Sequence, residues 1–563
     1  MRFYIFHSSL FVLRNNNFIF RLSSMKRSIF VLTTVLLSAL VSFAEEPADS
    51  AIRYHRFFAH DINYYFNLLD GSENPTRLTR NSVNSLILAS ISGLFNRGEF
   101  HAIDRSSKSN NLHVDISGLQ QIGKVSLDAG FSYQYSRDED RCWNNTLYVS
   151  RHNPFFVADS IPSDMTKEEF NMYATAAFPF SDKLTGGLQL KYLTGSFADQ
   201  SDPRPKVNSM RFDIIPGVTY QLNEKLTLGA NAKVELFHSK LTHLIIDGLI
   251  PYTYFIMKGM GDHQIFTNAD NSSYPRDYKG LNLGGAIQML FSGDAISNFL
   301  QLGYLNTDEK AIDGGSSYEY KGGDYSAHEF SLLDRLTFGN SRLTQQNLTL
   351  KGSMLMDKGL WYDQKKHTDT EHGNIHFYEI LNKSKVHKNR VMDASVEYRF
   401  DRFRNNPDEK NISQNILTDW QLRGLVGFSS VEYTHYESDN YKQNYKLLHT
   451  LAEGKRYWKM GKGLLETSLT GFYTANLSDK YNNVREKLAG VFVAPAFEYE
   501  AASLAGFQVR VAYHLPVRTY GTFTWMGLHT QMNESFYLGS NKYSPHYDGA
   551  SRTLMDVGID FVF

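Results

Sequence analysis

"LMDVGIDFVF", residues 554–563, ends the sequence on an alternating run. Successive side chains of an extended strand point to opposite faces, so every second residue shares a face. One face carries Met555, Val557, Ile559, Phe561 and Phe563, and the other carries Leu554, Asp556, Gly558, Asp560 and Val562. The run therefore predicts a strand with one apolar and one polar face. Half-buried strands of soluble sandwiches share this pattern, so the rest of the sequence has to decide the solvent.

Alternating runs of this kind recur along the sequence. Four of them are "KVSLDAGFSYQY" (124–135), "KLTLGANAKVELF" (225–237), "MDASVEYRF" (392–400) and "FQVRVAYHL" (507–515). Such runs exceed the usual strand of about five or six residues in soluble sheets, and they match the ~9–11 residues that cross a bilayer at a tilt. Strand length therefore favours a membrane.

The connections between these runs alternate between tight and long. Tight connections lie near Gly123 and at 181–183, 223–225, 292–297, 339–342, 459–463 and 500–505. Long polar stretches lie at about 137–169, 241–277, 307–326, 357–388 and 532–550. Short turns at one end and long loops at the other are typical of outer-membrane barrels.

These patterns predict an all-β fold, a transmembrane antiparallel up-and-down β-barrel with about 18 strands, or with 14 or 16 as alternatives. The barrel would cover residues 83–563, with predicted strands that include 488–500 and 505–531. Pro516 either breaks the second of these strands or divides it into two, and Pro216 and Pro495 favour bulges or kinks. Phe561 and Phe563, on the lipid face of the last strand, resemble the terminal signal that the barrel-assembly machinery recognises.

The start of the sequence predicts export. Lys26 and Arg27 precede an apolar run over 29–41, and the small residues Ser42 and Ala44 follow it, so residues 25–44 have the form of a signal peptide. The alternative, a membrane anchor, needs about 20 apolar residues. Residues 1–24 are then a misassigned upstream start. Residues 45–82 form a periplasmic N-terminal segment, which either makes a short helix or lines the lumen, and which is too short for the plug domain of an energised receptor.

Composition narrows the class of protein. Lys+Arg number 58 and Asp+Glu number 59, which argues against nucleic acid as a partner. Tyr and Phe number 34 and 39 although the mean hydropathy is −0.38, as expected for a barrel with aromatic girdles. Cys142 is the only cysteine, which excludes an internal disulfide and a lipid-anchored cysteine after the signal. We expect the outer membrane of a Gram-negative bacterium, with its lipid as a partner.

Charges of both signs fall on the predicted inner face. The candidates for lining the lumen are Lys124, Asp128, Arg211, Asp213, Lys233, Glu235, Glu397, Arg399, Arg510, Asp556 and Asp560. Ion-selective pores carry rings of one sign, whereas a mixed wall is more simply explained by cross-strand pairs. A water-filled conduit is compatible with either interpretation.

Other chemistry has weaker support in the sequence. His367, His372 and His376 in "HTDTEHGNIH" are candidate ligands for a divalent cation, but their spacing fits no closed zinc motif, and a solvated loop is the simpler interpretation. No residues mark a catalytic Ser-His-Asp set, and no cofactor is expected. We therefore expect no enzyme.

Three stretches carry a resemblance that covers nearly the whole mature chain. They are residues 96–137, the hairpin "RYWKMGKGLLETSLTGFY" (456–473) and the terminal "GIDFVF". The sequence resembles an outer-membrane β-barrel family of Bacteroidetes-type bacteria, a domain of unknown function, and is only faintly similar in architecture to outer-membrane transporters of hydrophobic substrates. The resemblance implies a fold and a compartment but no activity. Two functions stay open: a passive conduit or transporter for small solutes, and a surface protein that binds through its extracellular loops.

Overall fold

The computed structural model describes residues 56–247, 250–268, 274–314, 319–341, 343–371, 375–405, 416–436, 441–482, 488–519 and 522–563. The predicted upstream start (1–24) and signal peptide (25–44) lie outside the described residues. In the part that is described, one antiparallel sheet of 18 strands closes into a barrel. The predicted all-β antiparallel barrel is confirmed.

The barrel strands follow one another in chain order, each paired with the next. They are β1 (Ser85–Arg97), β2 (Lys108–Ile122), β3 (Val125–Arg141), β5 (Ser163–Pro179), β6 (Leu184–Asp199), β7 (Pro205–Gln221), β8 (Leu226–His243), β11 (Arg276–Ser292), β12 (Ile296–Asp313), β13 (Tyr320–Ser341), β14 (Thr344–Asp369), β15 (Ile375–Asn405), β16 (Ile416–His435), β17 (Tyr441–Met460), β18 (Gly463–Tyr481), β19 (Leu504–Thr519), β20 (Thr522–Tyr537) and β21 (Ser551–Val562). β1 pairs with both β2 and β21, which closes the barrel and leaves it without an open edge.

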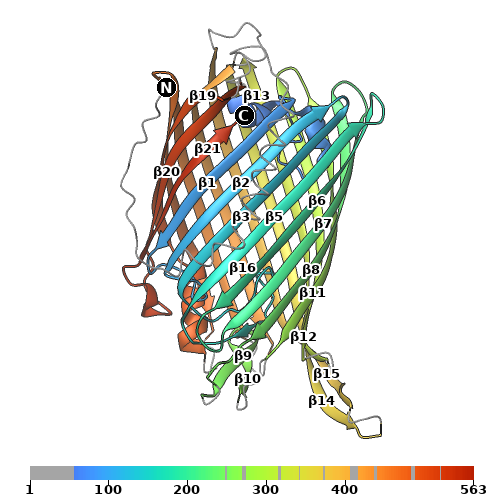
Figure 1. Ribbon diagram of the computed structural model, residues 1–563, viewed down its shortest axis with the longest axis vertical. Coiled ribbons are helices and arrows are strands. Elements are labelled where there is room, and N and C mark those ends of the chain that lie inside the picture. The colour runs from blue at the N-terminus through green and yellow to red at the C-terminus, as the bar shows by residue number, and fades with distance from the viewer. Residues whose placement is uncertain are drawn as a thin grey trace, which may run out of the picture. The chain divides into compact units, whose positions relative to one another are not determined.

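The two ends of the barrel differ. At the turn end, short connections such as Gly123-Lys124 and Gly461-Lys462 join the strands, and β1 begins beside the end of β21. At the loop end, a small sheet forms from β4 (Val157–Ala158), β9 (Tyr252–Gly259) and β10 (Asp262–Asn268), and the hairpin of β14 and β15 projects from the barrel (Figure 1). The remaining elements are α3 (Ala59–Phe66), η1 (Pro75–Arg80), η2 (Ala489–Val493), α4 (Ala494–Glu500) and η3 (Pro545–Tyr547).

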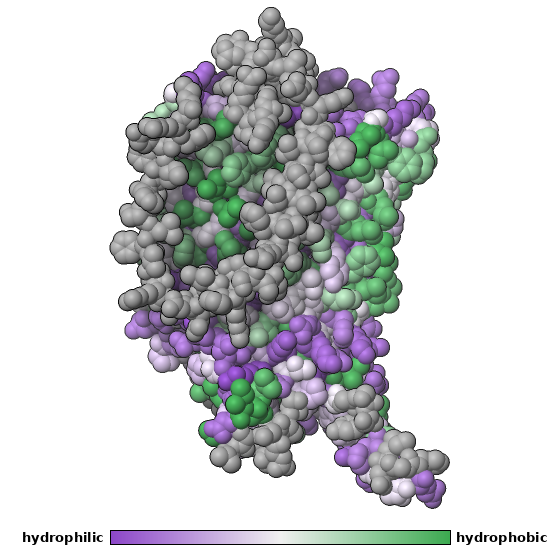
Figure 2. Space-filling view, in the orientation of Figure 1, coloured by the Kyte–Doolittle hydropathy of each residue, from purple (hydrophilic) through white to green (hydrophobic). Residues whose placement is uncertain are grey.

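Alternation along each strand gives the wall two unlike faces. On β8, the outward-pointing Leu228 and Leu236 are 42% and 43% exposed, whereas Asn231 and Glu235 between them are buried toward the lumen. Apolar residues gather along one flank of the barrel and polar residues toward its loop end (Figure 2). An outer surface of exposed aliphatic and aromatic side chains is stable against lipid rather than water. None of the helices in the described residues has the length and apolar content of a membrane-spanning helix.

Several sequence predictions differ from the structure. Residues 488–500, predicted as a strand, form η2 and α4. Pro495 lies in the first turn of α4, where the backbone N–H that proline lacks has no partner within the helix. Residues 505–531, predicted as one strand, form β19 and β20. The stretch 357–388, predicted as a loop, lies mostly within the long hairpin of β14 and β15. The first two errors offset each other, so the number of strands still agrees.

Candidate functional site in the barrel lumen

The N-terminal segment occupies the lumen at the turn end. Phe57 and Phe58 precede α3 and pack against the inner wall, where Phe57 contacts Trp525 with a ring-centroid distance of 5.0 Å and Phe58 contacts Tyr457 at 5.0 Å. Further along, Leu69 packs with Leu290 and Phe299 of β11 and β12. We call residues 56–82 the plug, because they contact the wall from β3 round to β20.

Polar contacts fix the plug to the wall. Asp61 of α3 is buried and accepts hydrogen bonds from Arg399 Nη2, Thr418 Oγ1 and Gln421 Nε2, each at 3.0 Å. Burial raises the pKa of Asp61, but the neighbouring His60 ring and the charges of Lys455 and Arg399 outweigh it, so the pKa lies well below its usual value. Asp61 is therefore ionised at neutral pH and binds three donors of the wall.

A second polar anchor lies at the start of η1. The side chain of Asn74 caps this helix by accepting from Thr76 N at 3.1 Å, and its amide donates to the carbonyl oxygens of Val218 and Ala230 at 3.1 and 3.2 Å. The plug lies close to the sheet backbone here, since a Cβ at Gly217 would lie 2.5 Å from both Asn74 and Pro75. Glycine at this position lets the plug approach the sheet backbone.

The loop end is closed by inward-folded connections. Phe155, from the connection between β3 and β5, is fully buried and packs with Tyr278, Tyr325 and Trp361. A Cβ at Gly323 would lie 2.4 Å from the Phe155 ring, so this position of the wall has room for a phenylalanine only because it carries no side chain. The side chains of Ser150 and Asn153 donate to the buried Glu309 of β12 at 2.6 and 2.9 Å.

Two further connections complete this closure. In the connection between β8 and β11, Asp262 accepts from Lys258 at 3.1 Å and lies 3.2 Å from His435 of β16. In the connection between β18 and β19, Glu500 of α4 pairs with Arg151 at 3.3 Å. We call the described residues of these three connections, 142–162, 244–268 and 488–503, the cap.

A row of charges runs along the wall from the plug to the cap. Glu73 of the plug lies 3.9 Å from Lys233 Nζ, which lies 3.7 Å from Glu235. Glu235 lies 3.2 Å from Arg211 Nε, and Arg211 Nη2 donates to the carbonyl oxygen of Tyr148 in the cap at 2.8 Å. These alternating charges connect the two closures of the lumen without a gap.

Between plug and cap the wall is polar and partly open. A pocket of about 550 Å³ lies against β1, β2, β3 and β5, where Ser90 faces both Asp115 of β2 and Asp560 of β21. Across the lumen, Asp393 is exposed and accepts from Ser429 at 2.5 Å. Hydroxyl, amide and carboxylate groups here can bind a polar solute through hydrogen bonds.

Ten of the residues predicted to line the lumen lie on its inner face, and most form pairs across strands. The pairs include Asp128 with Arg77 of the plug, Asp213 with Lys233, Arg211 with Glu235, Glu397 with Arg423, Arg399 with Asp61, Arg510 with Asp560 and Asp556 with His529. Lys124 differs, because it lies exposed in the turn between β2 and β3 and not on a strand. The mixed signs thus pair with one another, as the simpler sequence interpretation holds.

The predicted histidine cluster is spread along the projecting hairpin. His367 Nε2 lies 2.7 Å from Glu379, and His376 Nδ1 lies 2.9 Å from Thr368 Oγ1, while His372 lies outside the described residues. No group of three or more His, Cys, Asp or Glu is placed to hold a metal ion in the described part of the chain. At the terminus, the rings of Phe561 and Phe563 stack with centroids 6.2 Å apart.

The sequence prediction allowed residues 45–82 to line the lumen, but it did not identify the individual residues that hold this segment or the cap in place. Asp61, Asn74 and Phe155 belong to no alternating run, so the period-2 pattern gives them no face. A signal exists for Phe155, because "PFFVA" (154–158) is an apolar run inside an otherwise polar connection. For Asn74, the sequence Asn-Pro-Thr has the form of a helix N-terminus with proline at its first position.

The fold and the lumen define the class: a transmembrane-type antiparallel barrel whose inner wall contacts segments of its own chain at both ends. Within this class the chain belongs to the Family of unknown function (DUF6850), whose sequence profile matches residues 75–563. The match covers η1 and every barrel strand. The predicted resemblance to a barrel family of unknown function is confirmed. No curated protein matches the chain.

Several solved barrel structures are similar to this chain at low identity. The ferric preacinetobactin receptor BauA from Acinetobacter baumannii is 10% identical over 85% of this chain and 80% of that chain, with a TM-score of 0.36. The outer membrane transporter YddB from Escherichia coli is 10% identical over 85% and 81%, with a TM-score of 0.36. A FadL homologue from Pseudomonas aeruginosa is 9% identical over 92% and 98%, with a TM-score of 0.30. A likeness at this level concerns the barrel fold alone.

Proposed function

We propose that the protein lies in the outer membrane of a Gram-negative bacterium and passes small polar solutes through its lumen, without enzymatic activity. The lipid-facing surface of the strands and the unlike ends of the barrel support this location, with the turn end facing the periplasm. Lipid and, during biogenesis, the barrel-assembly machinery are the partners that such a location requires. Nucleic acid has no place in this function.

One observation carries the proposal: among the described residues, the segments that occupy the polar lumen are two parts of the chain that are not barrel strands. A barrel of 18 strands is wide enough for an aqueous channel unless loops or other segments fill it. Here the plug fills the turn end and the cap fills the loop end. The protein is therefore a gated conduit, closed in the described state, and not an open porin.

Single-channel conductance in planar bilayers tests this proposal. We expect the intact protein to conduct little, and variants that lack either residues 57–81 or all three connections of the cap (144–160, 245–267 and 489–502) to conduct little more, because the other closure remains. A variant that lacks both should conduct, with weak ion selectivity, because the wall carries charges of both signs. A folded double deletion that conducts no ions would overturn the conduit.

A binding function at the cell surface is the second candidate. The hairpin of β14 and β15 supports it, because these strands are 26 and 31 residues long and extend beyond the barrel (Figure 1). Its exposed apolar residues Phe377, Ile380 and Leu381 offer a contact surface. This function takes precedence if the double deletion stays silent.

A further inference from the structure

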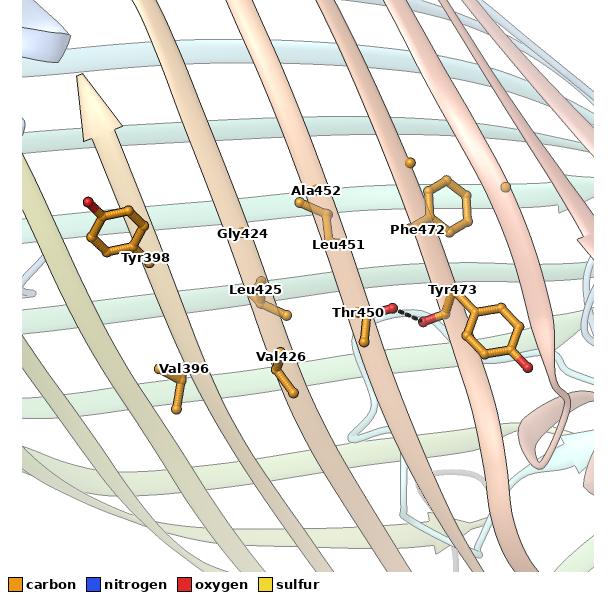
Figure 3. Close-up of a pocket in the computed structure, with 12 residues that line it drawn as sticks. Val396, Tyr398, Gly424, Leu425, Val426, Thr450, Leu451, Ala452, Phe472 and Tyr473 are labelled. Carbon is orange, nitrogen blue, oxygen red and sulfur yellow. Dashed lines mark hydrogen bonds between the residues drawn. The ribbon is translucent and has the colours of Figure 1, made fainter. Parts of the chain in front are cut away.

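A shallow groove marks the outer face of the barrel over β15 to β18. Figure 3 shows Val396 and Tyr398 on β15, Gly424 and Val426 on β16, and neighbouring residues of β17 and β18 side by side. The groove has a volume of about 660 Å³, and Val396, Val426 and Tyr473 beside it are outward-pointing and exposed. It therefore opens toward the lipid.

Small residues form the floor of this groove. Gly424 faces Ala452 across β16 and β17, and Ala452 faces Gly471 across β17 and β18. A Cβ at Gly471 would meet nothing within 4 Å, so no neighbouring side chain fills the space. Toward the turn end, Gly454 continues the floor into a second pocket of about 580 Å³ beside Leu422 and Leu469.

Two arginines lie at the turn end of the groove, on the same outer face. Arg402 of β15 faces Trp420 of β16, and Trp420 faces Arg456 of β17. Both arginines are exposed, and no described carboxylate lies within 4.0 Å of either guanidinium. The Arg456 guanidinium lies 4.1 Å from the ring centroid of Trp458, whose Nε1 donates to Thr467 at 3.2 Å. These contacts hold a positive charge at the membrane surface.

The distance between the two arginines and the far end of the groove matches the thickness of one leaflet. Thr450 and Arg456 are six residues apart on β17, or about 20 Å along a strand. At the tilt of ~35–45° usual for such barrels, this distance covers about 15 Å of the membrane normal, half of the ~30 Å hydrocarbon core. The arginines thus lie at the depth of the headgroups when the groove lies beside the acyl chains.

We propose that this groove binds an anionic glycerophospholipid of the leaflet at the turn end. Its phosphate lies between Arg402 and Arg456, and an acyl chain fills the floor formed by Gly424, Ala452 and Gly471. Guanidinium groups pair with phosphate in bidentate geometry. An anionic headgroup is favoured over a zwitterionic one because it lacks the additional cation that two arginines would repel. The site requires a membrane-spanning barrel but does not depend on solute transport.

Tryptophan fluorescence provides a local readout for this site. Trp420 and Trp458 lie beside Arg402 and Arg456. The other three tryptophans, Trp143, Trp361 and Trp525, are buried inside the barrel. The full-length protein is reconstituted in phosphatidylcholine vesicles that contain either brominated phosphatidylglycerol or brominated phosphatidylcholine. We expect stronger quenching by the brominated phosphatidylglycerol. Arg402→Gln and Arg456→Gln should each lower this preference about fivefold, and the double variant should remove it.

Matched variants separate the groove from general effects on the barrel. Gly471→Leu, which fills the floor, should reduce quenching, whereas Ala174→Leu on the outer face of β5 should not. Lys124→Gln removes an exposed cation at the same end of the barrel and should leave the preference unchanged. Heat-modifiable gel mobility shows which variants fold, and the arginine variants test the site even if Gly471→Leu does not.

Two results would overturn the lipid site. Equal quenching by the two brominated lipids in the intact protein excludes selection of an anionic headgroup. Disulfide-linked dimers of Gly471→Cys in a Cys142→Ser background, formed in the same vesicles, show instead that a second copy of the chain covers the groove. A monomeric protein with selective quenching supports the site.

Discussion

Asp61 shows how one side chain can hold a whole segment inside a barrel. Its carboxylate accepts three hydrogen bonds from three side chains on β15 and β16, and it is buried with its charge. Arg399 also pairs with Asp401 at 2.7 Å, so the arginine keeps a partner when Asp61 is lost. Thr418 and Gln421 have no such second acceptor among their described contacts. Loss of Asp61 therefore leaves Arg399 paired within the wall but removes the contact that holds the plug.

Asp61→Ala should loosen the plug without unfolding the barrel. Charge-assisted hydrogen bonds contribute on the order of 1.5–3 kcal/mol each, so amide exchange in residues 57–69 should rise by at least about tenfold. Hydrogen–deuterium exchange with mass spectrometry measures this in the purified protein. Asp182→Ala, in the exposed turn between β5 and β6, is the control and should leave exchange unchanged. Equal exchange in the two variants would mean that Asp61 does not hold the plug.

Period-2 alternation predicts the face of a residue but not its partner. The pattern placed Asp128, Lys233 and Arg510 on the inner face, where the structure also has them. It misplaced Lys124, because the boundary between strand and turn depends on the hairpin and not on the period. Arg510 pairs with both Glu466 and Asp560, which lie 44 positions before it and 50 after it in the chain, and such pairs depend on strand order and register.

At the scale of elements, the charged row makes plug and cap one mechanical unit. Lys233 is central, because its ammonium lies within 4.0 Å of Glu73, Asp213 and Glu235. Glu235 in turn contacts Arg211, which binds the cap. Networks with shared members are coupled, so removal of the central charge should be felt at both ends.

Lys233→Met should therefore raise amide exchange in the plug and also in residues 147–155 of the cap, by about fivefold or more at each. Lys191→Met is the matched control, because Lys191 lies 3.7 Å from Glu73 and forms no ion pair with Glu235 among the described residues. It should affect the plug and leave the cap unchanged. If Lys233→Met changes only one closure, the row is a set of independent pairs.

Helices in the cap could not be predicted from alternation. "AGVFVAPAFEYE" (489–500) is apolar at most positions, so both periods fit a part of it, and its length suits a strand. The structure resolves this through tertiary contacts, since Phe497 packs on Tyr445 and Tyr481 of the wall. The barrel, in contrast, was predictable because every strand repeats the same two-faced pattern over a length that only a membrane needs.

At the scale of the whole molecule, the wall separates lipid from lumen. An arginine substituted on either face tests which solvent that face contacts, through its effect on the free energy of unfolding. Leu228→Arg places a charge on the outer face near mid-strand and should lower the free energy of unfolding by roughly 2–4 kcal/mol. Ser353→Arg places the same side chain in the lumen, where Ser353 faces Asp393 of β15. It should cost far less. Urea titrations in lipid vesicles measure both, and equal costs would mean that the two faces meet the same solvent.

The seam between β1 and β21 closes the barrel, and its backbone pairing extends to Phe563. Phe563 continues the pairing of β21 with β1, because its backbone N–H donates to Ile87 O at 2.9 Å and its carbonyl accepts from Ile87 N at 3.2 Å. Its ring stacks with that of Phe561 on the outer face. Deletion of Phe563 removes both the last backbone pair of the seam and the terminal aromatic ring.

We expect this deletion to leave the protein degraded or trapped in the periplasm, because β1 and β21 pair between the two ends of the barrel sequence and such non-local pairing is slow to form. Membrane fractionation and heat-modifiable gel mobility measure the outcome. Phe563→Trp keeps the aromatic ring and the backbone pair, and it should assemble normally. Phe563→Asp keeps the backbone pair but places a charge at the lipid face, so impaired assembly of this variant assigns the effect to the ring. Normal levels of the deletion variant in the outer membrane would show that neither the ring nor the pair is needed for assembly.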